Sequence, residues 1–305
     1  MRAFQENNAS LNRFEKERIV INKLVKAALA AVLAITCIAS AACAEFDAGK
    51  DIDVISREDG SGTRGAFIEL TGVEQKIDGN KVDMTTEDAQ ITNSTAVMLS
   101  TVAGDPYAIG YVSLGSLNDT VKAVLVEGVE ATAANVADGS YVLARPFNIA
   151  YREDTLSDLG RDFIAYVMSA EGQTIINDKG YVGNADAPAY EGTLPEGKLV
   201  VAGSSSVSPV MEKLIEAYLA VNTNAKIELQ TSDSTTGMTS AIGGTCDIGM
   251  ASRELKAEEA EQLTSIAIAM DGIAVIVNNE NPTDGLDKAQ IAAIYTGETT
   301  AWSEI

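Results

Sequence analysis

The sequence predicts an α/β protein in which strands and helices alternate along the chain. Three observations support this fold class: short apolar runs typical of strands, helix-like segments that follow them, and hydroxyl- and glycine-rich turns at the junctions. The chain has 305 residues, of which 46% are hydrophobic. It is therefore long enough to bury a substantial core, as one large or two modest globular units.

The first half of the chain contains four apolar segments that we predict to be strands. They are residues 52–56, 108–112, 122–126 and 141–150. Helix-like segments lie at residues 63–70 and 94–102. Residues 159–178 carry apolar side chains at helical spacing around an internal glycine, Gly172, and we predict a single helix there.

The second half repeats the alternation of strand and helix. The predicted strands are residues 198–202, 226–230, 247–251 and 273–277. The predicted helices are residues 210–221, 238–242, 257–263 and 290–294. Repeated strand–helix–strand order is typical of a sheet covered by helices.

Residues 1–44 are predicted to be a secretory signal peptide. Two lysines precede residues 27–44, an uncharged, alanine-rich run that ends in small side chains. A membrane-spanning anchor is the competing interpretation, which the small side chains disfavour. Two processing schemes remain open, cleavage after Ala44 and lipid attachment at Cys43. In either case we expect an exported protein that works outside the cytoplasm, in the periplasm or at the cell surface.

Composition and charge exclude several classes of function. The chain has no histidine, which removes Ser-His-Asp and Cys-His catalysis and every His-containing zinc site. Residues 1–44 hold six basic and three acidic residues, so the remainder carries a formal charge of −25. Nucleic acids and anionic membranes both require clustered cations and are disfavoured as partners. We expect no enzyme activity, no cofactor and no metal.

Three hydroxyl- and glycine-rich turns, each between a strand and a helix, are candidate anion-binding sites. They are Asp59-Gly60-Ser61-Gly62-Thr63, Gly203-Ser204-Ser205-Ser206 and Ser232-Asp233-Ser234-Thr235-Thr236-Gly237. Free N–H groups at a helix start, the positive end of the helix dipole and hydroxyl donors together suit a tetrahedral anion. Ordinary helix capping is the alternative for any single turn.

Four motifs closely resemble those of the phosphate-binding proteins of bacterial phosphate ABC importers. They are SREDGSGTRGAF (residues 56–67), GSSSVSPVMEKL (203–214), DIGMASRELK (247–256) and DGIAVIVN (271–278). The resemblance implies a two-lobed, periplasmic-binding-protein-like fold of type II. Such a protein closes on one phosphate, as a monomer, and delivers it to a membrane permease. The implied lobes are residues 46–150 with 276–305, and residues 152–274.

The order of the motifs is reversed relative to that family. Here the SREDGSGTR segment opens the mature chain, whereas in the family it follows the other motifs and the TGE-x-x-x-WSEI segment that ends this chain. A circular permutation explains this order, because exposed loops tolerate new chain ends. A fragment of a tandem gene is the alternative.

The resemblance also assigns phosphate-binding residues. Arg57 matches the arginine that clamps two phosphate oxygens, and Asp59 matches the acid that orients it. The matching hydroxyl and N–H donors are Ser61, Gly62, Thr63, Ser205, Ser206 and Ser234.

Selectivity is the point at which this sequence departs from the family. Some members have an aspartate at the position aligned with Ser252, where it accepts the proton of hydrogen phosphate, and a serine accepts less decisively. Asp271 is the carboxylate that we prefer in the cleft, with a hinge or capping role as the alternative. Sulfate or molybdate remains an alternative ligand. A phosphatase is disfavoured because no activating base is evident.

Overall fold

One nine-stranded sheet is the framework of the protein, with strand order β10-β9-β11-β8-β12-β5-β1-β4 and β6 added on β12. The structure, a computed structural model, describes residues 46–305, and residues 47–305 form one compact unit. The predicted signal peptide, residues 1–44, and Cys43 lie outside the described residues. Within residues 46–305, every helix is too short or too polar to traverse a lipid bilayer.

The elements have the following bounds. The strands of the main sheet are β1 (Asp53–Arg57), β4 (Gln90–Thr92), β5 (Ala108–Ser113), β6 (Val121–Ala123), β8 (Ala144–Tyr151), β9 (Gly197–Ser204), β10 (Ala225–Ser232), β11 (Ile248–Ala251) and β12 (Thr264–Asn278). The helices are α2 (Gly62–Thr71), α3 (Thr95–Gly104), α4 (Ala133–Ala137), α5 (Asp158–Val167), α6 (Ala170–Asp178), α7 (Ser208–Val221), α8 (Ser234–Gly243), α9 (Ala257–Ala260) and α10 (Lys288–Thr296). Smaller elements are the pairs β2 (Glu74–Ile77) with β3 (Asn80–Asp83) and β7 (Leu125–Val126) with β13 (Gly285–Leu286), and the 3-10 turns η1 (Leu114–Ser116) and η2 (Trp302–Glu304).

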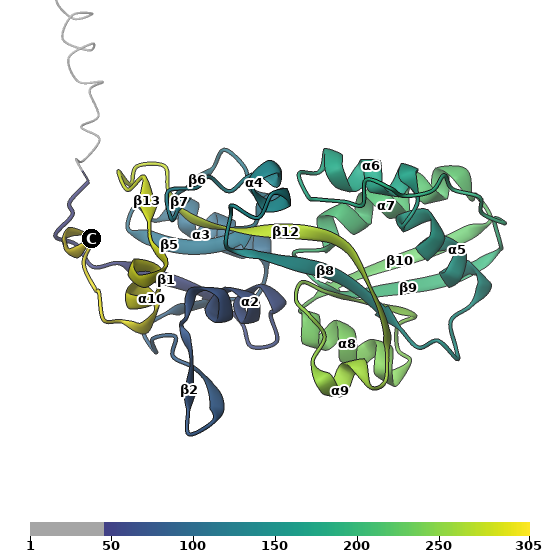
Figure 1. The fold of residues 1–305 in the computed structure, drawn as a ribbon, viewed down its shortest axis with the longest axis horizontal. Helices are drawn as coiled ribbons and strands as arrows, with labels where there is room; N and C mark the ends of the chain where they lie inside the picture. The colour runs from purple at the N-terminus through teal and green to yellow at the C-terminus, as the bar shows by residue number, and fades with distance from the viewer. Residues whose placement is uncertain (1–45) are drawn as a thin grey trace, which may run out of the picture. The chain divides into compact units, whose positions relative to one another are not determined.

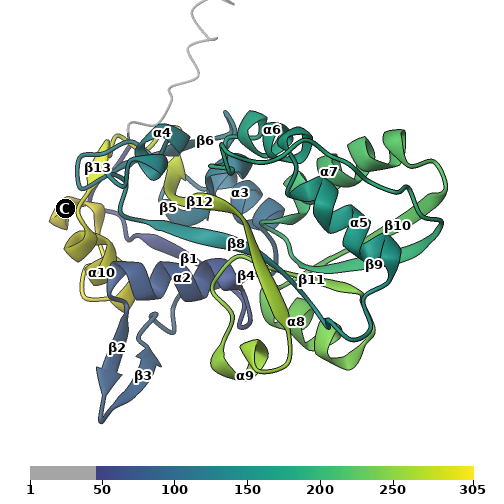
Figure 2. The same cartoon turned by 45° about the vertical axis from the view of Figure 1, so that its right-hand side comes forward.

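Two lobes flank a central pair of strands. Strands β8 and β12 run antiparallel and side by side from one lobe to the other (Figures 1 and 2). On one side, β5, β1 and β4 are parallel, and we call them, with α2, α3 and α10, the arginine lobe. On the other side, β11, β9 and β10 are parallel, and we call them, with α5 to α8, the serine lobe.

Each lobe has its own packing. The main hydrophobic cluster of the serine lobe takes all its members from residues 147–269. In the arginine lobe, the ring of Phe67 on α2 stacks on Tyr111 of β5 with centroids 4.0 Å apart, and Tyr295 of α10 meets Phe67 edge-on at 4.7 Å. Buried aromatic pairs of this kind stabilise beyond their area alone, by about 0.5–1.5 kcal/mol each. Helix α10 is thereby packed against α2 and β5.

The two ends of the compact unit also pair through the backbone. Asp51 forms an isolated antiparallel bridge with Ala301, and the N–H of Ile52 donates to the carbonyl of Thr300 at 2.7 Å. A chain whose ends lie together in this way is suited to circular permutation.

The prediction of one helix over residues 159–178 is wrong. The chain forms α5, ends it, and starts α6 with Ser169 as the cap, whose hydroxyl accepts from the N–H of Gly172 at 3.2 Å. A Cβ atom at Gly172 would lie only 2.3 Å from the carbonyl oxygen of Tyr166, so the glycine permits a close turn between two helices. The apolar spacing continued through this break and concealed it.

The other predicted strands and helices are present, with three notable differences. Residues 122–126, predicted as one strand, form two short strands, β6 and β7, that belong to different sheets. Strand β12 covers residues 264–278 rather than 273–277, because it pairs along β8 and then along β5 and so passes through both lobes. The β2–β3 hairpin, which projects from the arginine lobe (Figure 2), and the short strand β4 were not predicted. Their residues are mostly exposed and carry little of the apolar signal on which strand prediction depends.

Candidate functional site

The carboxyl ends of the parallel strands in both lobes lead into hydroxyl-rich turns. Strands β1 and β4 of the arginine lobe end before α2 and α3, and strands β9, β10 and β11 of the serine lobe end in or before serine residues. Ligands in open α/β sheets bind outside the carboxyl ends of the strands, where helix N-termini point at them. The structure therefore brings the predicted turns to one place.

Seven buried hydroxyl groups meet there, and we call them the hydroxyl cluster. They are Thr63, Thr95, Ser204, Ser205, Ser206, Ser234 and Ser252, each at most 7% exposed. The Thr63 hydroxyl lies 2.8 Å from that of Ser206, which is also 3.1 Å from that of Thr95. The Ser204 hydroxyl donates to that of Ser252 at 2.9 Å. Because these residues come from both lobes, the structure is a closed arrangement.

Arg57, at the end of β1, presents one edge of its guanidinium to this cluster. Its Nη2 donates to the Ser205 hydroxyl at 3.1 Å and its Nη1 to the Thr95 hydroxyl at 3.5 Å. Its other edge, Nε and Nη2, donates to the two carboxylate oxygens of Glu58 at 2.7 and 2.8 Å. Glu58 thus fixes the guanidinium so that the Nη1–Nη2 edge is available to a tetrahedral anion.

The expectation that Asp59 orients Arg57 is wrong. The Asp59 side chain is fully exposed and accepts a hydrogen bond from Arg64 Nη1 at 3.1 Å. The N–H of Glu58 still donates to the carbonyl of Thr92 as a continuation of the strand pairing, and the chain turns only after it. The side chain of Glu58 therefore lies beside Arg57, while that of Asp59 points to solvent.

Gly62 and Ser61 form the start of α2 at this site. A Cβ atom at Gly62 would lie 2.4 Å from the Ser234 hydroxyl and 2.8 Å from the Ser252 hydroxyl, so only glycine allows the helix start to approach the serine lobe. The Ser61 hydroxyl accepts from the N–H of Arg64 at 3.3 Å and caps the helix. Gly62 is in contact with the cluster, whereas the Ser61 hydroxyl supports the turn.

Asp271 lies outside the hydroxyl cluster, on the central strand β12. Its carboxylate pairs with Arg145 of β8 at 2.8 Å and accepts from the Ser113 hydroxyl at 2.9 Å and the Leu114 N–H at 3.2 Å. Burial raises the pKa of this carboxyl group, and the adjacent Arg145 acts in the opposite direction. These contacts place Asp271 at the hinge, the alternative that the sequence left open.

Three further members of the site, Thr95, Glu58 and Ser204, were not assigned as binding residues from the sequence, although Ser204 was part of a predicted turn. Thr95 is the first residue of α3, after the N-cap Ser94, and its turn follows β4. The same strand, hydroxyl turn and helix pattern would have identified it if β4 had been recognised. Glu58 was passed over because Asp59 matched the family pattern.

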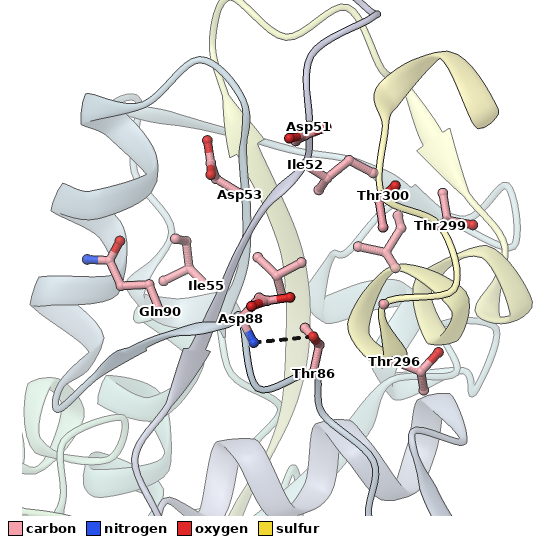
Figure 3. Close-up of a pocket in the computed structure, with 13 residues that line it drawn as sticks. Asp51, Ile52, Asp53, Ile55, Thr86, Asp88, Gln90, Thr296, Thr299 and Thr300 are labelled. Atoms are coloured by element: carbon pink, nitrogen blue, oxygen red, sulfur yellow. Dashed lines mark hydrogen bonds between the residues drawn. The ribbon is translucent and has the colours of Figure 1, made fainter.

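A separate pocket of about 380 Å³ lies beside β1 and α10 in the arginine lobe (Figure 3). Asp51, Asp53 and Asp88 line it together with several threonines. Burial, followed by the nearby carboxylate of Asp105, raises the pKa of Asp53. A pocket with this many carboxylates repels anions, so it does not compete with the hydroxyl cluster as an anion site. No group of three or more potential ligands within residues 46–305 is arranged to hold a metal ion.

The fold and this site define a binding protein of the PBP superfamily, whose domain matches residues 20–171 and 185–304. The phosphate-binding protein PstS 2 of Streptococcus agalactiae is 52% identical over 256 residues, which are 83% of this chain and 87% of the relative. That of Streptococcus pneumoniae is 45% identical over 272 residues, which are 89% and 93% of the two chains. This chain belongs to the PstS family of phosphate-binding proteins, as its motifs predicted.

A solved structure agrees with this assignment. A phosphate-binding protein of a phosphate ABC transporter from Streptococcus pneumoniae matches with a TM-score of 0.67 and 46% identity, over 84% of this chain and 99% of that chain. A putative substrate-binding protein with bound phosphate from Clostridium perfringens is 43% identical over 42% of this chain and 50% of that chain, with a TM-score of 0.38. The predicted α/β fold of the periplasmic-binding-protein type is confirmed, and these relatives are transport proteins, not enzymes.

Proposed function

We propose that this chain is the solute-binding protein of a phosphate ABC importer. It captures inorganic phosphate between the arginine lobe and the serine lobe and delivers it to the membrane permease. The observation that carries this proposal is the closed, buried hydroxyl cluster that meets the Nη1–Nη2 edge of Arg57. The names of the streptococcal relatives, which share about half of their residues with this chain, support it.

Neutral donors suit a dehydrated phosphate. Arg57 and Glu58 balance each other's charge, so the charge of the anion is stabilised by hydroxyl groups and by the N-termini of α2, α3 and α8. When an anion binds, the hydroxyl-to-hydroxyl bonds of the cluster exchange for bonds to phosphate oxygens. The residues that we propose as ligands are Arg57, Gly62, Thr63, Thr95, Ser205, Ser206, Ser234 and Ser252.

Calorimetric titration of the exported protein tests this function. We expect one phosphate per chain, and sulfate and molybdate to compete poorly at neutral pH. Equal affinity for sulfate would favour the alternative of a general oxyanion receptor. Absence of heat and of protection against unfolding with all three anions would contradict a binding function.

We further infer that the chain is circularly permuted relative to part of its family. The pairing of Asp51 with Ala301 supports this, as does the extent of the alignments. The streptococcal relatives align over 256 and 272 residues, but a Staphylococcus aureus phosphate-binding protein, 38% identical, aligns over only 111, which are 34% of each chain. When two chains have the same segments in a different order, a single continuous alignment can include only one of those segments. Coverage of 87% and 93% of the streptococcal relatives weighs against a tandem-gene fragment.

Reordering the chain tests the permutation. A variant that joins Ile305 to Asp47 through a short linker and opens in the coil at residues 185–196 restores the order of the family motifs. We expect it to fold and to bind phosphate with unchanged affinity. Failure of this variant to fold, with the natural order stable, would contradict the inference.

We propose the remaining features on the same basis. Residues 1–44 direct export of the protein, which works outside the cytoplasm as a monomer. The signal is processed either by cleavage after Ala44 or by lipid attachment at Cys43. The lobes divide as residues 46–150 with 276–305, and residues 152–274, a division that the serine-lobe cluster within residues 147–269 supports. The mass of the exported protein distinguishes cleavage after Ala44 from lipidation.

A further inference from the structure

Arg57 reaches the anion site from the last position of β1, where strand pairing continues on one side only. On the β4 side, pairing extends to Arg57, which lies opposite Thr92. On the β5 side, the paired residues of β1 are Asp53 and Val54. The backbones of β1 and β5 have thus separated before Arg57, and a buried N–H group at this position needs another partner, because leaving it unpaired costs free energy.

The side chain of Tyr111, on β5, supplies this partner. Its hydroxyl accepts a hydrogen bond from the N–H of Arg57 at 3.1 Å and lies 2.9 Å from the Ser56 hydroxyl. Tyr111 and Ser56 are both fully buried. Burial raises the pKa of Tyr111 to about 12, so its hydroxyl stays neutral at physiological pH and brings no negative charge to the anion site.

The Tyr111 ring is itself held in place by other aromatic side chains. It stacks on Phe67 of α2 with centroids 4.0 Å apart, and its centroid lies 5.7 Å from that of Tyr295 of α10. The carbonyl of Arg57 is held as well, since Arg64 Nη1 donates to it at 2.8 Å. Both polar groups of the Arg57 main chain are therefore fixed by side chains, one of them by a buried ring with little freedom to move.

We propose that Tyr111 is a positioning residue for phosphate recognition, which sets the place and direction from which the Arg57 guanidinium meets the anion. A shift of the Arg57 main chain moves its Nη1–Nη2 edge relative to the Ser205 hydroxyl, and hydrogen bonds weaken steeply when their geometry is poor. Tyr111 acts through Arg57 and not by contact with the anion. The proposal deepens the proposed phosphate-binding function and rests on it.

Tyr111→Phe tests this proposal, and Tyr295→Phe is its matched control. Both tyrosines are fully buried in the same aromatic group, and both hydroxyls bond to the backbone of β1. The Tyr295 hydroxyl, however, donates to the carbonyl of Ile55 at 3.2 Å and not to Arg57. Each variant removes one hydroxyl and keeps the ring, so we expect similar losses of stability in urea unfolding.

Phosphate affinity should distinguish the two variants. Only Tyr111→Phe should weaken binding, by about tenfold, the factor that corresponds to one weakened hydrogen bond to a charged group. Titration calorimetry measures the effect. Wild-type affinity in Tyr111→Phe, or an equal loss in Tyr295→Phe, overturns the proposal.

A double-mutant cycle separates positioning from general destabilisation. In Arg57→Lys the guanidinium is gone, so adding Tyr111→Phe should change phosphate affinity by less than about twofold, whereas its effect on the free energy of unfolding should persist. Affinity losses that add in full would show that Tyr111 acts independently of Arg57, which contradicts the proposal.

Ser56→Ala takes the place of Tyr111→Phe if that variant does not fold. It removes the hydroxyl that lies against the Tyr111 hydroxyl and so loosens the group that holds the Arg57 N–H. We expect severalfold weaker phosphate binding, and wild-type affinity in Ser56→Ala would then overturn the proposal.

Amide hydrogen exchange without any anion distinguishes this proposal from the proposed function. The Arg57 N–H should be protected in the wild type and in Tyr295→Phe, and it should exchange faster in Tyr111→Phe. If it exchanges alike in all three proteins, the positioning role is wrong even though phosphate binds. If the exchange differs as expected but the wild type binds no phosphate, Tyr111 holds Arg57 and the assigned ligand is wrong.

Discussion

Replacing Arg57 by lysine tests the proposed anion site. Among residues 46–305, Arg57 is the only charged side chain that donates to the hydroxyl groups of the cluster. Arg57 makes four side-chain hydrogen bonds, two to Glu58 and one each to Ser205 and Thr95. Lysine keeps the positive charge but lacks the planar guanidinium group, so it cannot donate hydrogen bonds to the Glu58 carboxylate and to two phosphate oxygens at the same time.

The expected loss follows from these contacts. At least one hydrogen bond to a charged group disappears, which is worth about 1.5–3 kcal/mol. That corresponds to a roughly tenfold to hundredfold weaker affinity for phosphate. Because Glu58 is 20% exposed, it retains some contact with water, and we expect the Arg57→Lys protein to fold.

Titration calorimetry with phosphate measures the effect, and the neighbouring acid provides the control. Asp59→Asn removes a fully exposed carboxylate one residue beyond Glu58 and should leave binding near the wild-type value. Glu58→Gln should weaken binding, since it loosens the guanidinium. Wild-type affinity in Arg57→Lys, or an equal loss in Asp59→Asn, would refute the placement of the anion at this edge of Arg57.

Further outcomes can be measured independently. Gly62→Ala should abolish tight phosphate binding by holding α2 away from the serine lobe, whereas Gly65→Ala, with open space around it, should bind normally. Thr95→Val should weaken phosphate binding severalfold while the melting temperature stays close to wild type. Burial tends to raise the pKa of Asp162, but hydrogen bonds from two tyrosines and a threonine lower this pKa overall. The ionised Asp162 therefore stabilises the fold fully above its unfolded pKa of about 3.9, and this stabilisation is lost as the pH falls through the lower pKa of the folded state. Urea unfolding should show Asp162→Asn destabilised at pH 7, by a margin that shrinks below about pH 4. The acidity of the chain predicts that phosphate association speeds up modestly with added salt, and stopped-flow rates that fall steeply would contradict this.

The architecture was largely predictable from the sequence because buried strands are apolar and hydroxyl-rich turns follow them. Strands such as β5 and β11 lie on opposite sides of the site and are mostly apolar. The hydroxyl-rich turns could be recognised as anion sites one by one. That the turns of both lobes meet around one cluster could not be derived from local spacing, since it depends on the path of β8 and β12.

Individual roles at the site were harder to predict for a geometric reason. Which of the two consecutive acids Glu58 and Asp59 faces Arg57 depends on the residue at which β1 stops pairing and the chain turns. Thr95 was missed because β4 has only three residues, two of them exposed. Asp271 could occupy a cleft or a hinge, and only the contact with Arg145 distinguishes the two.

A crystal structure of the protein grown with phosphate tests the central claim most directly. The account predicts one anion within hydrogen-bond distance of the Arg57 Nη atoms and of hydroxyl groups from both lobes, including Thr63 and Ser206, with Glu58 still bonded to Arg57 Nε. A phosphate bound elsewhere, with the hydroxyl groups of the cluster bonded only to one another, would contradict it.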